Sequence, residues 1–343
     1  MQDASRFSCI IPRMRKIILF LIFFLASGLV LFSFGELENT WETLHKSDFR
    51  FMGLAILLML AWTVSDALGY RSLFRLMEVK ESLWHLILLS SAANFINVVA
   101  PSGGFGGMAV FIDDAGRRKY PRGMAAAAAA LHLFLDYAAF MVVLGMGWVV
   151  LIRRNDLKMG EVTASFIMLV LFIGLGGFIY IGSHSGEQLG RVLAWFARHL
   201  NQILWPFVRR DYLHEETARA FSMEVAEGFS ILRVRRRGAL VPLLFALASK
   251  ALQTLILLMT FLAFDVVFSA GTVVAGFASY YLFLIVSPTP SGIGVVETLL
   301  PLALKSLNVP WEQAVVVTLT YRSLTFWLPL LVGAISFRIL QRE

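Results

Sequence analysis

The sequence contains little charge and almost no cysteine, and each shortage excludes a class of protein. Of its 343 residues, 15% are charged and 58% are hydrophobic, and the mean hydropathy is +0.73. Soluble domains carry about 25% charged residues, so a water-soluble globule is excluded. The one cysteine, Cys9, excludes both an internal disulfide and a cysteine metal site within the chain. The apolar content is enough for about seven or eight membrane segments of about 20 residues each.

The motifs of several enzyme classes are also missing. The sequence shows no zinc-ligand spacing and no hydrolase triad, and no Gly-x-x-x-x-Gly-Lys-Ser/Thr loop for ATP. We therefore expect no enzyme activity, no metal and no cofactor, and any transport should run downhill or be linked to protons. The net charge of +7 is expected to mark cytoplasmic loops beside anionic lipid, with no nucleic-acid partner.

Apolar stretches that can enter a bilayer recur along the chain. The first, residues 17–34, follows a basic leader at residues 1–16. We predict a retained transmembrane helix there, with a cleaved signal peptide as the alternative, because the run exceeds the about 7–15 apolar residues of a signal core. The other predicted segments are residues 49–70, 82–100, 124–152, 162–181, 239–264, 272–287, 293–307 and 314–340. This pattern predicts a first membrane half at residues 17–183 and a second at residues 239–343. Between them, residues 184–238 are expected to form a basic insertion. Its residues 189–207 are expected to form an amphipathic helix that lies in the membrane interface or, alternatively, packs on the cytoplasmic ends of the membrane helices.

Basic residues determine the expected topology. The positive-inside rule places the clusters at residues 71–80 and 117–122 in the cytoplasm. The apolar stretch between them must then cross the membrane an even number of times, yet it is too short for two full spans. We therefore predict a re-entrant helical hairpin over residues 82–118. The same count predicts a second hairpin over residues 272–307 that enters from the opposite face, with the insertion and both termini in the cytoplasm. Against the rule, it puts Arg153 and Arg154 outside.

The two predicted hairpins share a sequence pattern. The tripeptide Pro-Ser-Gly occurs at residues 101–103 and again at residues 290–292, and each copy is followed after the same interval by a proline, Pro121 or Pro310. Repeats of opposite topology are typical of transporters in which broken helices meet near the bilayer midplane and present backbone N–H groups to an anion. We therefore predict an all-α polytopic membrane protein with an inverted repeat and two re-entrant, broken helical hairpins.

Three motifs carry a resemblance to a known family. They are an Asn- and Gly-rich stretch at residues 94–107, the sequence Pro-Thr-Pro-Ser-Gly-Ile-Gly-Val-Val-Glu at residues 288–297, and Tyr321-Arg322 followed by Trp-Leu-Pro at residues 327–329. Together they resemble the membrane region of lysylphosphatidylglycerol synthases and related flippase-like proteins, over about residues 15–340. The resemblance implies a polytopic protein that moves lipids or lipid-linked groups between leaflets. The synthase half is not present in the sequence, so aminoacyl transfer is not expected.

The chain also departs from that family. Where the family often has arginine, this sequence has Ala-Val-Phe at residues 109–111 and Leu-His-Leu at residues 131–133, and it keeps Asp136. The headgroup specificity of the family is therefore not carried over.

Candidate site residues follow from these motifs and from the cost of charge inside a bilayer. Glu297 and Arg322 are expected either to serve a bound phosphate or to form a structural ion pair. His132 and Asp136 lie four residues apart on one helix face, as a candidate proton relay or a satisfied polar pair. The full candidate substrate-binding set is Asn94, Asn97, Pro101, Gly103, Gly104, Gly106, Pro290, Gly292, Gly294, Glu297, Tyr321 and Arg322.

Other polar residues have more local expectations. Asn94 and Asn97 are expected to cap freed backbone or to face a headgroup, and Asp66 and Lys250 need partners elsewhere in the chain. Two acid–arginine pairs at the end of the first hairpin are expected to be solvated, because their members are four residues apart on a helix. These pairs are Asp113 with Arg117 and Asp114 with Arg118.

Two functions fit the sequence. The first is a lipid translocase of the cytoplasmic membrane that moves an anionic or lipid-linked headgroup. The alternative is a proton-coupled secondary transporter of a small anionic solute. A translocase needs a cavity that opens sideways to lipid, whereas a solute carrier needs one sealed from the acyl region. The expected partners are membrane lipids and a lipid-modifying enzyme, and the sequence does not determine the oligomeric state.

Overall fold

A computed structural model describes residues 48–99, 105–154, 159–192, 195 and 215–342. The chain divides into the units Met1–Asp48 and Phe49–Glu343, and the helices that the structure describes all lie in the second unit. Every regular element in the described residues is helical, as predicted. Five helices there are long and apolar enough to cross a membrane, which confirms a polytopic membrane protein. The predicted span at residues 17–34 lies outside the described residues. The five stretches are Phe49–Leu76 (α3), Arg122–Arg154 (α6), Met159–His184 (α7), Arg237–Ala263, which contains α10 (Leu240–Ala263), and Trp311–Leu340.

Two pairs of shorter helices lie between these stretches. The first pair is α4 (Leu83–Val99) and α5 (Phe105–Arg118), on either side of the first Pro-Ser-Gly motif. The second pair is α11 (Ala270–Val286) and α12 (Val295–Ser306), separated by the short helix η2 (Pro290–Gly292). At about 1.5 Å per residue, none of the four reaches the roughly 30 Å thickness of a bilayer core.

Polar contacts join the outer ends of α4 and α5. Arg118 forms an ion pair with Glu81 (3.2 Å) and bonds through Nη2 to Nδ1 of His85 (2.9 Å). His85 Nε2 in turn lies 3.0 Å from the Asp114 carboxylate. Burial and the Asp114 charge raise the pKa of the Tyr120 hydroxyl above its ordinary value, so this group stays protonated and donates to Asp114 (3.4 Å). α4 therefore begins at the end of the molecule where α5 finishes.

The two ion pairs expected to be solvated differ in burial. Asp113 and Arg117 pair at 3.0 Å with both side chains exposed, as expected. Asp114 lies 3.6 Å from Arg118, but it is only 9% exposed and its closer partner is His85. The second pair therefore belongs to a buried cluster, because α4 covers it. Helix spacing alone does not reveal such a tertiary contact.

Arg154, at the end of α6, joins the outer ends of α11 and α12. Its guanidinium donates to the Leu307 carbonyl just after α12 (3.1 Å) and to the Ser269 hydroxyl that caps α11 (2.7 Å). These bonds give a structural reason for the presence of a basic residue at the C-terminal end of α6. Because α6 has 33 residues and is about 50 Å long, the two helix pairs start from opposite ends of α6.

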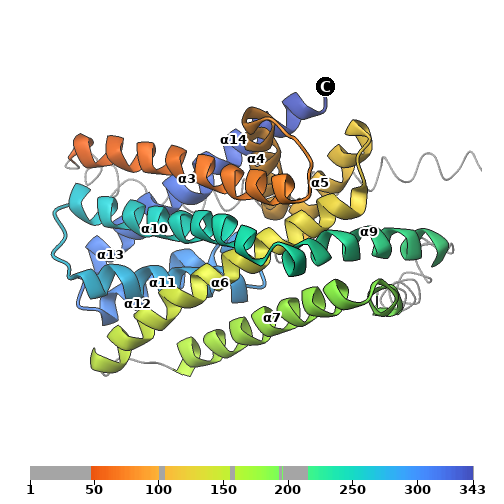
Figure 1. Ribbon diagram of the computed structural model, residues 1–343. Coiled ribbons are helices and arrows are strands. Elements are labelled where there is room, and N and C mark those ends of the chain that lie inside the picture. The colour runs from red at the N-terminus through yellow and green to blue at the C-terminus, as the bar shows by residue number, and fades with distance from the viewer. Residues whose placement is uncertain (1–47, 100–104, 155–158, 193–194, 196–214, 343) are drawn as a thin grey trace, which may run out of the picture. The chain divides into compact units, whose positions relative to one another are not determined.

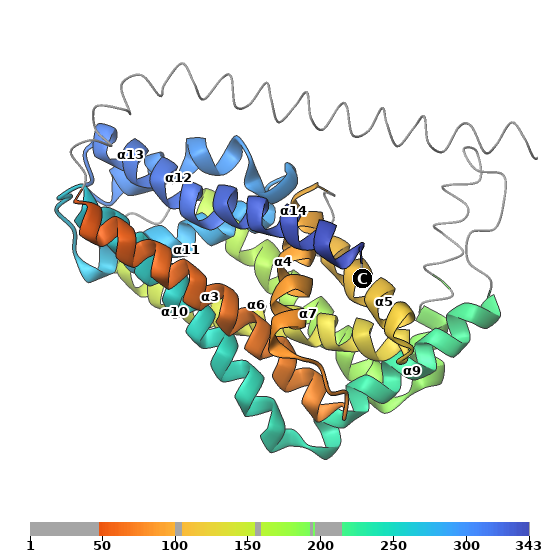
Figure 2. The ribbon, with the colours of Figure 1, turned by 90° about the horizontal axis from the view of Figure 1, so that it is seen from above.

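The most extensive helix–helix contacts of the fold join the two halves of the sequence. α3 packs along α10, α11 packs along α6, and α4 packs along α14 (Leu328–Leu340). Figures 1 and 2 both show α3 and α10 side by side, and α4 beside α14. α14 continues from α13 (Trp311–Arg322) through a π-helical turn, η3 (Ser323–Trp327). Pro329 accounts for this turn, because proline has no N–H and its ring clashes with the carbonyl four residues earlier.

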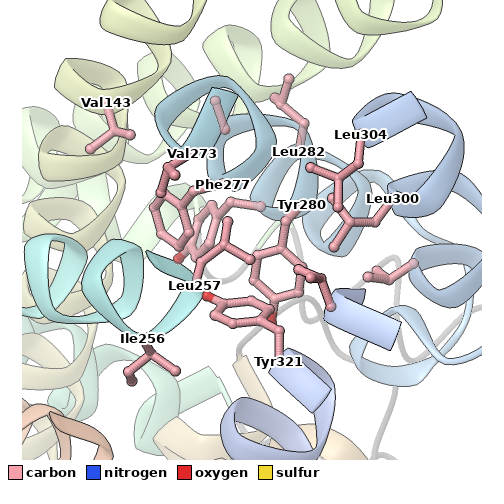
Figure 3. Close-up of a cluster of buried hydrophobic side chains, with 14 of the residues drawn as sticks. Val143, Ile256, Leu257, Val273, Phe277, Tyr280, Leu282, Leu300, Leu304 and Tyr321 are labelled. Atoms are coloured by element: carbon pink, nitrogen blue, oxygen red, sulfur yellow. The ribbon is translucent and has the colours of Figure 1, made fainter. Parts of the chain in front are cut away.

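Two large hydrophobic cores in the described residues support this arrangement. One core is centred on α10, α11, α12 and α13, and Figure 3 shows its aromatic and aliphatic side chains. The other surrounds the buried alanine run at residues 125–130 near the start of α6. There the helix α9 (Glu215–Val234) packs closely, and Glu224 accepts the Gly123 N–H (2.7 Å). The insertion is thus docked on the membrane helices through α9, and its predicted interfacial helix lies largely outside the described residues.

Gly333 is the point of closest approach between α14 and α4. A Cβ atom at this position would lie 2.4 Å from the Ser91 carbonyl oxygen and 2.8 Å from Phe95 Cβ. We expect Gly333→Ala to lower the free energy of unfolding by about 1–3 kcal/mol, because a backbone carbonyl cannot yield without moving its helix. Thermal unfolding of the detergent-solubilised protein measures this. Gly145→Ala is the matched control, since Gly145 has open space around it, and equal melting temperatures for the two variants would contradict the prediction.

Candidate functional site

A cavity of about 480 Å³ lies between the two pairs of short helices. Its wall includes Asn94, Asn97 and Gly107 from the first pair and residues 287–291 from the break in the second. The remaining wall comes from α3, α6, α7, α10, α11 and the stretch from α13 to α14. The volume falls in the range of about 300–1,000 Å³ that is typical of ligand pockets. Residues on both sides of the first break and residues of the second break therefore line one cavity.

Two acid–base pairs line this cavity. His132 Nε2 lies 2.9 Å from Asp66 Oδ1, and Lys250 Nζ lies 2.7 Å from Asp136 Oδ1. The Tyr281 hydroxyl also donates to Asp136. His132 and Asp136 share a face of α6, as their spacing predicts, but each bonds to partners on other helices. The predicted relay residues are therefore not a bonded pair, and the partners that they find are the two charges left unassigned in the sequence.

The charges of this cluster do not balance. Asp66 and Asp136 are two carboxylates facing one ammonium group, that of Lys250, which is 1% exposed. With a neutral imidazole at His132 the cluster has one net negative charge.

Glu297 and Arg322 form the ion pair predicted at the second break. Arg322 Nε donates to Glu297 Oε1 (2.7 Å), and Arg322 Nη2 donates to the Ser291 carbonyl (3.1 Å). Glu297 also accepts the Gly294 N–H (2.8 Å), which closes the start of α12. Arg322 therefore holds the tip of the second helix pair, and it also lines the cavity.

Several N–H groups expected to face an anion at the two breaks already have acceptors within the chain. At the second break, the N–H groups of Gly292 and Ile293 donate to the carbonyls of Thr289 (3.1 Å) and Pro290 (3.2 Å). Positive φ angles at Ser291, Gly292 and Gly294 create the tight turn that supplies these acceptors. At the first break, Gly107 N–H donates to Asn97 Oδ1 (2.6 Å), so Asn97 caps freed backbone, one of its two predicted roles.

The predicted site residues separate into three groups. The cavity is lined by Asn94, Asn97, Pro290 and Arg322, together with His132 and Asp136. The other described members, Gly106, Gly292, Gly294, Glu297 and Tyr321, do not line it. Tyr321 is fully buried, and its hydroxyl donates to the Gln253 carbonyl (3.3 Å). Pro101, Gly103 and Gly104 lie outside the described residues.

Several residues on the cavity wall were not predicted as site residues. On α3 these are Trp62, Asp66 and Tyr70, which recur every fourth residue and so share one helix face. On α10 they are Lys250 and Gln253, three residues apart in an apolar helix. These spacings were the signal available in the sequence. The two tyrosines at residues 280 and 281 also line the cavity, and no local pattern marks them.

The cavity also borders the outer surface of the helix bundle. Leu171, at the middle of α7, lines the cavity and is 43% exposed. Its neighbour Ile173 is 62% exposed and does not line the cavity. α7 is the most apolar of the five long helices in the described residues, so its outer face suits contact with lipid.

Comparison with known proteins agrees with this membrane architecture. The family described as the lysylphosphatidylglycerol synthase TM region matches residues 16–333. The chain is also 23% identical over 322 residues to the UPF0104 membrane protein MJ1595 of Methanocaldococcus jannaschii, with 92% of each chain covered. No solved structure matches the chain. Because the family match spans both pairs of short helices and every helix that borders the cavity, the chain is an integral membrane protein that belongs to the family of lysylphosphatidylglycerol synthase TM regions.

Proposed function

We propose that the protein is a lipid translocase that moves an anionic or lipid-linked headgroup between the leaflets of the cytoplasmic membrane. The observation that carries this proposal is a polar cavity, walled by both broken helix pairs, that borders lipid-facing surface at Leu171 in the middle of α7. A headgroup crosses through the polar cavity while its apolar tails remain in lipid beside α7. The two environments then match the two parts of the substrate.

The packing of the helices supports an inverted repeat with two re-entrant hairpins. Both helix pairs are too short to span, and their outer ends lie at opposite ends of α6. The contact of α4 with α14 has its counterpart in the contact of α11 with α6, as expected when two similar halves exchange their hairpins. A pseudo-twofold arrangement of this kind allows the cavity to face each leaflet in turn.

The basic clusters support the proposed orientation. Arg117 donates to the Leu340 carbonyl (3.2 Å), and Arg235 pairs with Glu78 (2.8 Å). The basic segments after α3, α5 and α9 therefore gather with the C-terminal helix end on one side, which we assign to the cytoplasm. Both termini are cytoplasmic in this proposal.

The acid–base cluster supports proton-linked movement. Two carboxylates, one lysine and one histidine line the cavity, and no ATP-binding loop is present in the sequence. The proposal gives this chain transport and no catalysis, so a lipid-modifying enzyme is the expected partner that supplies or consumes the lipid. The same cluster is the observation that favours the second candidate, a proton-coupled carrier of a small anionic solute.

Reconstitution separates the two candidates. Liposomes with fluorescent phospholipids and a leaflet-specific quencher report lipid movement, and uptake of a radiolabelled anion reports solute transport. We expect the wild-type protein to move lipid and Leu171→Trp to slow it, because the larger ring narrows the cavity edge at α7. Ile173→Trp is the matched control on the same helix and should move lipid like the wild type. Anion uptake without lipid movement would instead identify a solute carrier.

A further inference from the structure

The wall that the second half contributes to the cavity carries polar groups without partners. Gln253, Tyr280 and Arg322 line the cavity, and they are only 7%, 4% and 1% exposed. Among the residues that the structure describes, no hydrogen bond is made by the Gln253 side-chain amide, the Tyr280 hydroxyl or Arg322 Nη1. None of these three groups is among the fully buried polar atoms without a partner, so each remains reachable from the cavity, where a ligand can satisfy it.

These three residues are neighbours because all of them adjoin Tyr321. The Tyr321 hydroxyl donates to the Gln253 carbonyl, and its ring lies edge-on to Tyr280 with 4.8 Å between the ring centroids. Figure 3 shows the side chains of Tyr280 and Tyr321 together in the core. Arg322 follows Tyr321 directly in the chain. Three different helices, α10, α11 and α13, therefore contribute cavity-lining residues that adjoin Tyr321.

The guanidinium of Arg322 is held in place before any ligand binds. Nε is fixed by Glu297 and Nη2 by the Ser291 carbonyl, which leaves Nη1 as the unoccupied donor. Its face also lies 4.3 Å from the Phe326 ring centroid. A cation fixed in this way loses little side-chain freedom when it binds an anion, which favours affinity.

The distribution of charges around the cavity favours anion binding at this wall rather than at the other walls of the cavity. The carboxylates that line the cavity, Asp66 and Asp136, come from α3 and α6. The Lys250 ammonium is already bound by Asp136, so it is not a free ligand group. Glu297, which pairs with Arg322, has its charge neutralised by that pair and does not line the cavity.

We propose that Gln253, Tyr280 and Arg322 form a subsite for the phosphate group of the translocated headgroup. An amide N–H, a phenol O–H and a guanidinium N–H are all donors, and a phosphate offers several acceptor oxygens to meet them. The inference rests on the proposed function and narrows it, because it makes the substrate a phosphate ester. Free inorganic phosphate shares this chemistry and is the other source that the experiment must separate.

Binding to the purified full-length protein in detergent tests the subsite. Phosphatidylglycerol, diacylglycerol and inorganic phosphate are the three probes. We expect wild type to bind phosphatidylglycerol more tightly than diacylglycerol, which has the same tails and no phosphate. Tyr280→Phe and Gln253→Met each remove one donor with little change in shape, and each should weaken phosphatidylglycerol binding about 10- to 100-fold, as for other hydrogen bonds to a charged group.

Two controls separate binding from folding. Tyr321→Phe removes a neighbouring hydroxyl that is bonded to the backbone and does not line the cavity, so it should leave the affinity unchanged. Tyr280→Phe should leave the melting temperature equal to or above that of the wild type, because its hydroxyl has no partner among the described residues. If Tyr280 had only a structural role, the Tyr280→Phe protein would be less stable and would still bind phosphatidylglycerol with wild-type affinity.

The outcomes distinguish the subsite from the translocase. If the wild type, Tyr280→Phe and Gln253→Met all bind phosphatidylglycerol with the same affinity, the subsite is wrong, even if the protein moves lipid in liposomes. Binding of inorganic phosphate that is sensitive to both variants, without any binding or movement of lipid, would support the anion subsite and overturn the translocase. Binding of phosphatidylglycerol and diacylglycerol with one affinity would overturn the phosphate assignment.

Discussion

Arg322→Ala is expected to stop lipid movement in liposomes and to lower the free energy of unfolding by roughly 3 kcal/mol. The variant leaves Glu297 without its counter-ion and frees the Ser291 carbonyl at the tip of the second helix pair. Breaking a buried ion pair costs about 3–5 kcal/mol. We take the low end because the Glu297 side chain is 25% exposed. Chemical unfolding in detergent and the leaflet-quenching assay measure the two effects.

A double variant distinguishes the two roles predicted for this pair. Glu297→Gln with Arg322→Gln removes both charges, while the glutamine at residue 297 can still accept the Gly294 N–H. We expect it to recover most of the lost stability, because no unpaired charge remains. Lipid movement should stay absent, because the cation on the cavity wall is gone. A double variant that moves lipid at the wild-type rate would show that Arg322 only holds the hairpin tip.

Asp136→Asn is expected to lower the free energy of unfolding by about 3–5 kcal/mol, the typical cost of leaving a buried charge unpaired. Lys250 is 1% exposed, and its ammonium bonds to both carboxylate oxygens of Asp136 and lies 3.9 Å from the Tyr281 ring centroid. Asparagine has almost the same shape as aspartate, and its side-chain carbonyl can still accept a hydrogen bond from the Tyr281 hydroxyl. The expected loss therefore comes from charge rather than from a cavity, and chemical unfolding in detergent measures it.

Two further variants control this prediction. Asp136→Asn with Lys250→Met removes the ammonium as well and should regain most of the stability. Asp66→Asn removes the other carboxylate, but its partner His132 can be neutral, so the loss should be smaller. An Asp136→Asn protein that unfolds at the same denaturant concentration as Asp66→Asn would contradict the assignment of Lys250 as a buried cation that depends on Asp136.

Helix positions were predictable from the sequence because their causes are local. The stretch predicted at residues 239–264 is α10 (Leu240–Ala263), and the one at residues 124–152 is α6 (Arg122–Arg154). Long apolar runs specify such helices, and Pro and Gly motifs specify where they break. The π-helical turn after Arg322 was not predicted, although Pro329 supplies its cause. A proline inside an apolar run indicates a distortion without specifying its form.

The partners of the buried charges depended on long-range packing. Asp136 and Lys250 are 114 residues apart, and the repeat pattern gave no register for α6 against α10. For the same reason Tyr321, which stands in a family motif, was predicted to contact substrate. The structure instead places Tyr280 on the cavity wall and turns Tyr321 towards the backbone of α10.

Composition and local patterns alone were sufficient to identify a helical membrane protein with two breaks of like sequence. Hydropathy and backbone stereochemistry act over a few residues, so one chain segment contains all the information for each of these features. Only the packed bundle decided which polar groups meet across the cavity and which donors remain free. A partner on a distant helix is selected by the side chains that fill the space between helices, and no segment contains that information by itself.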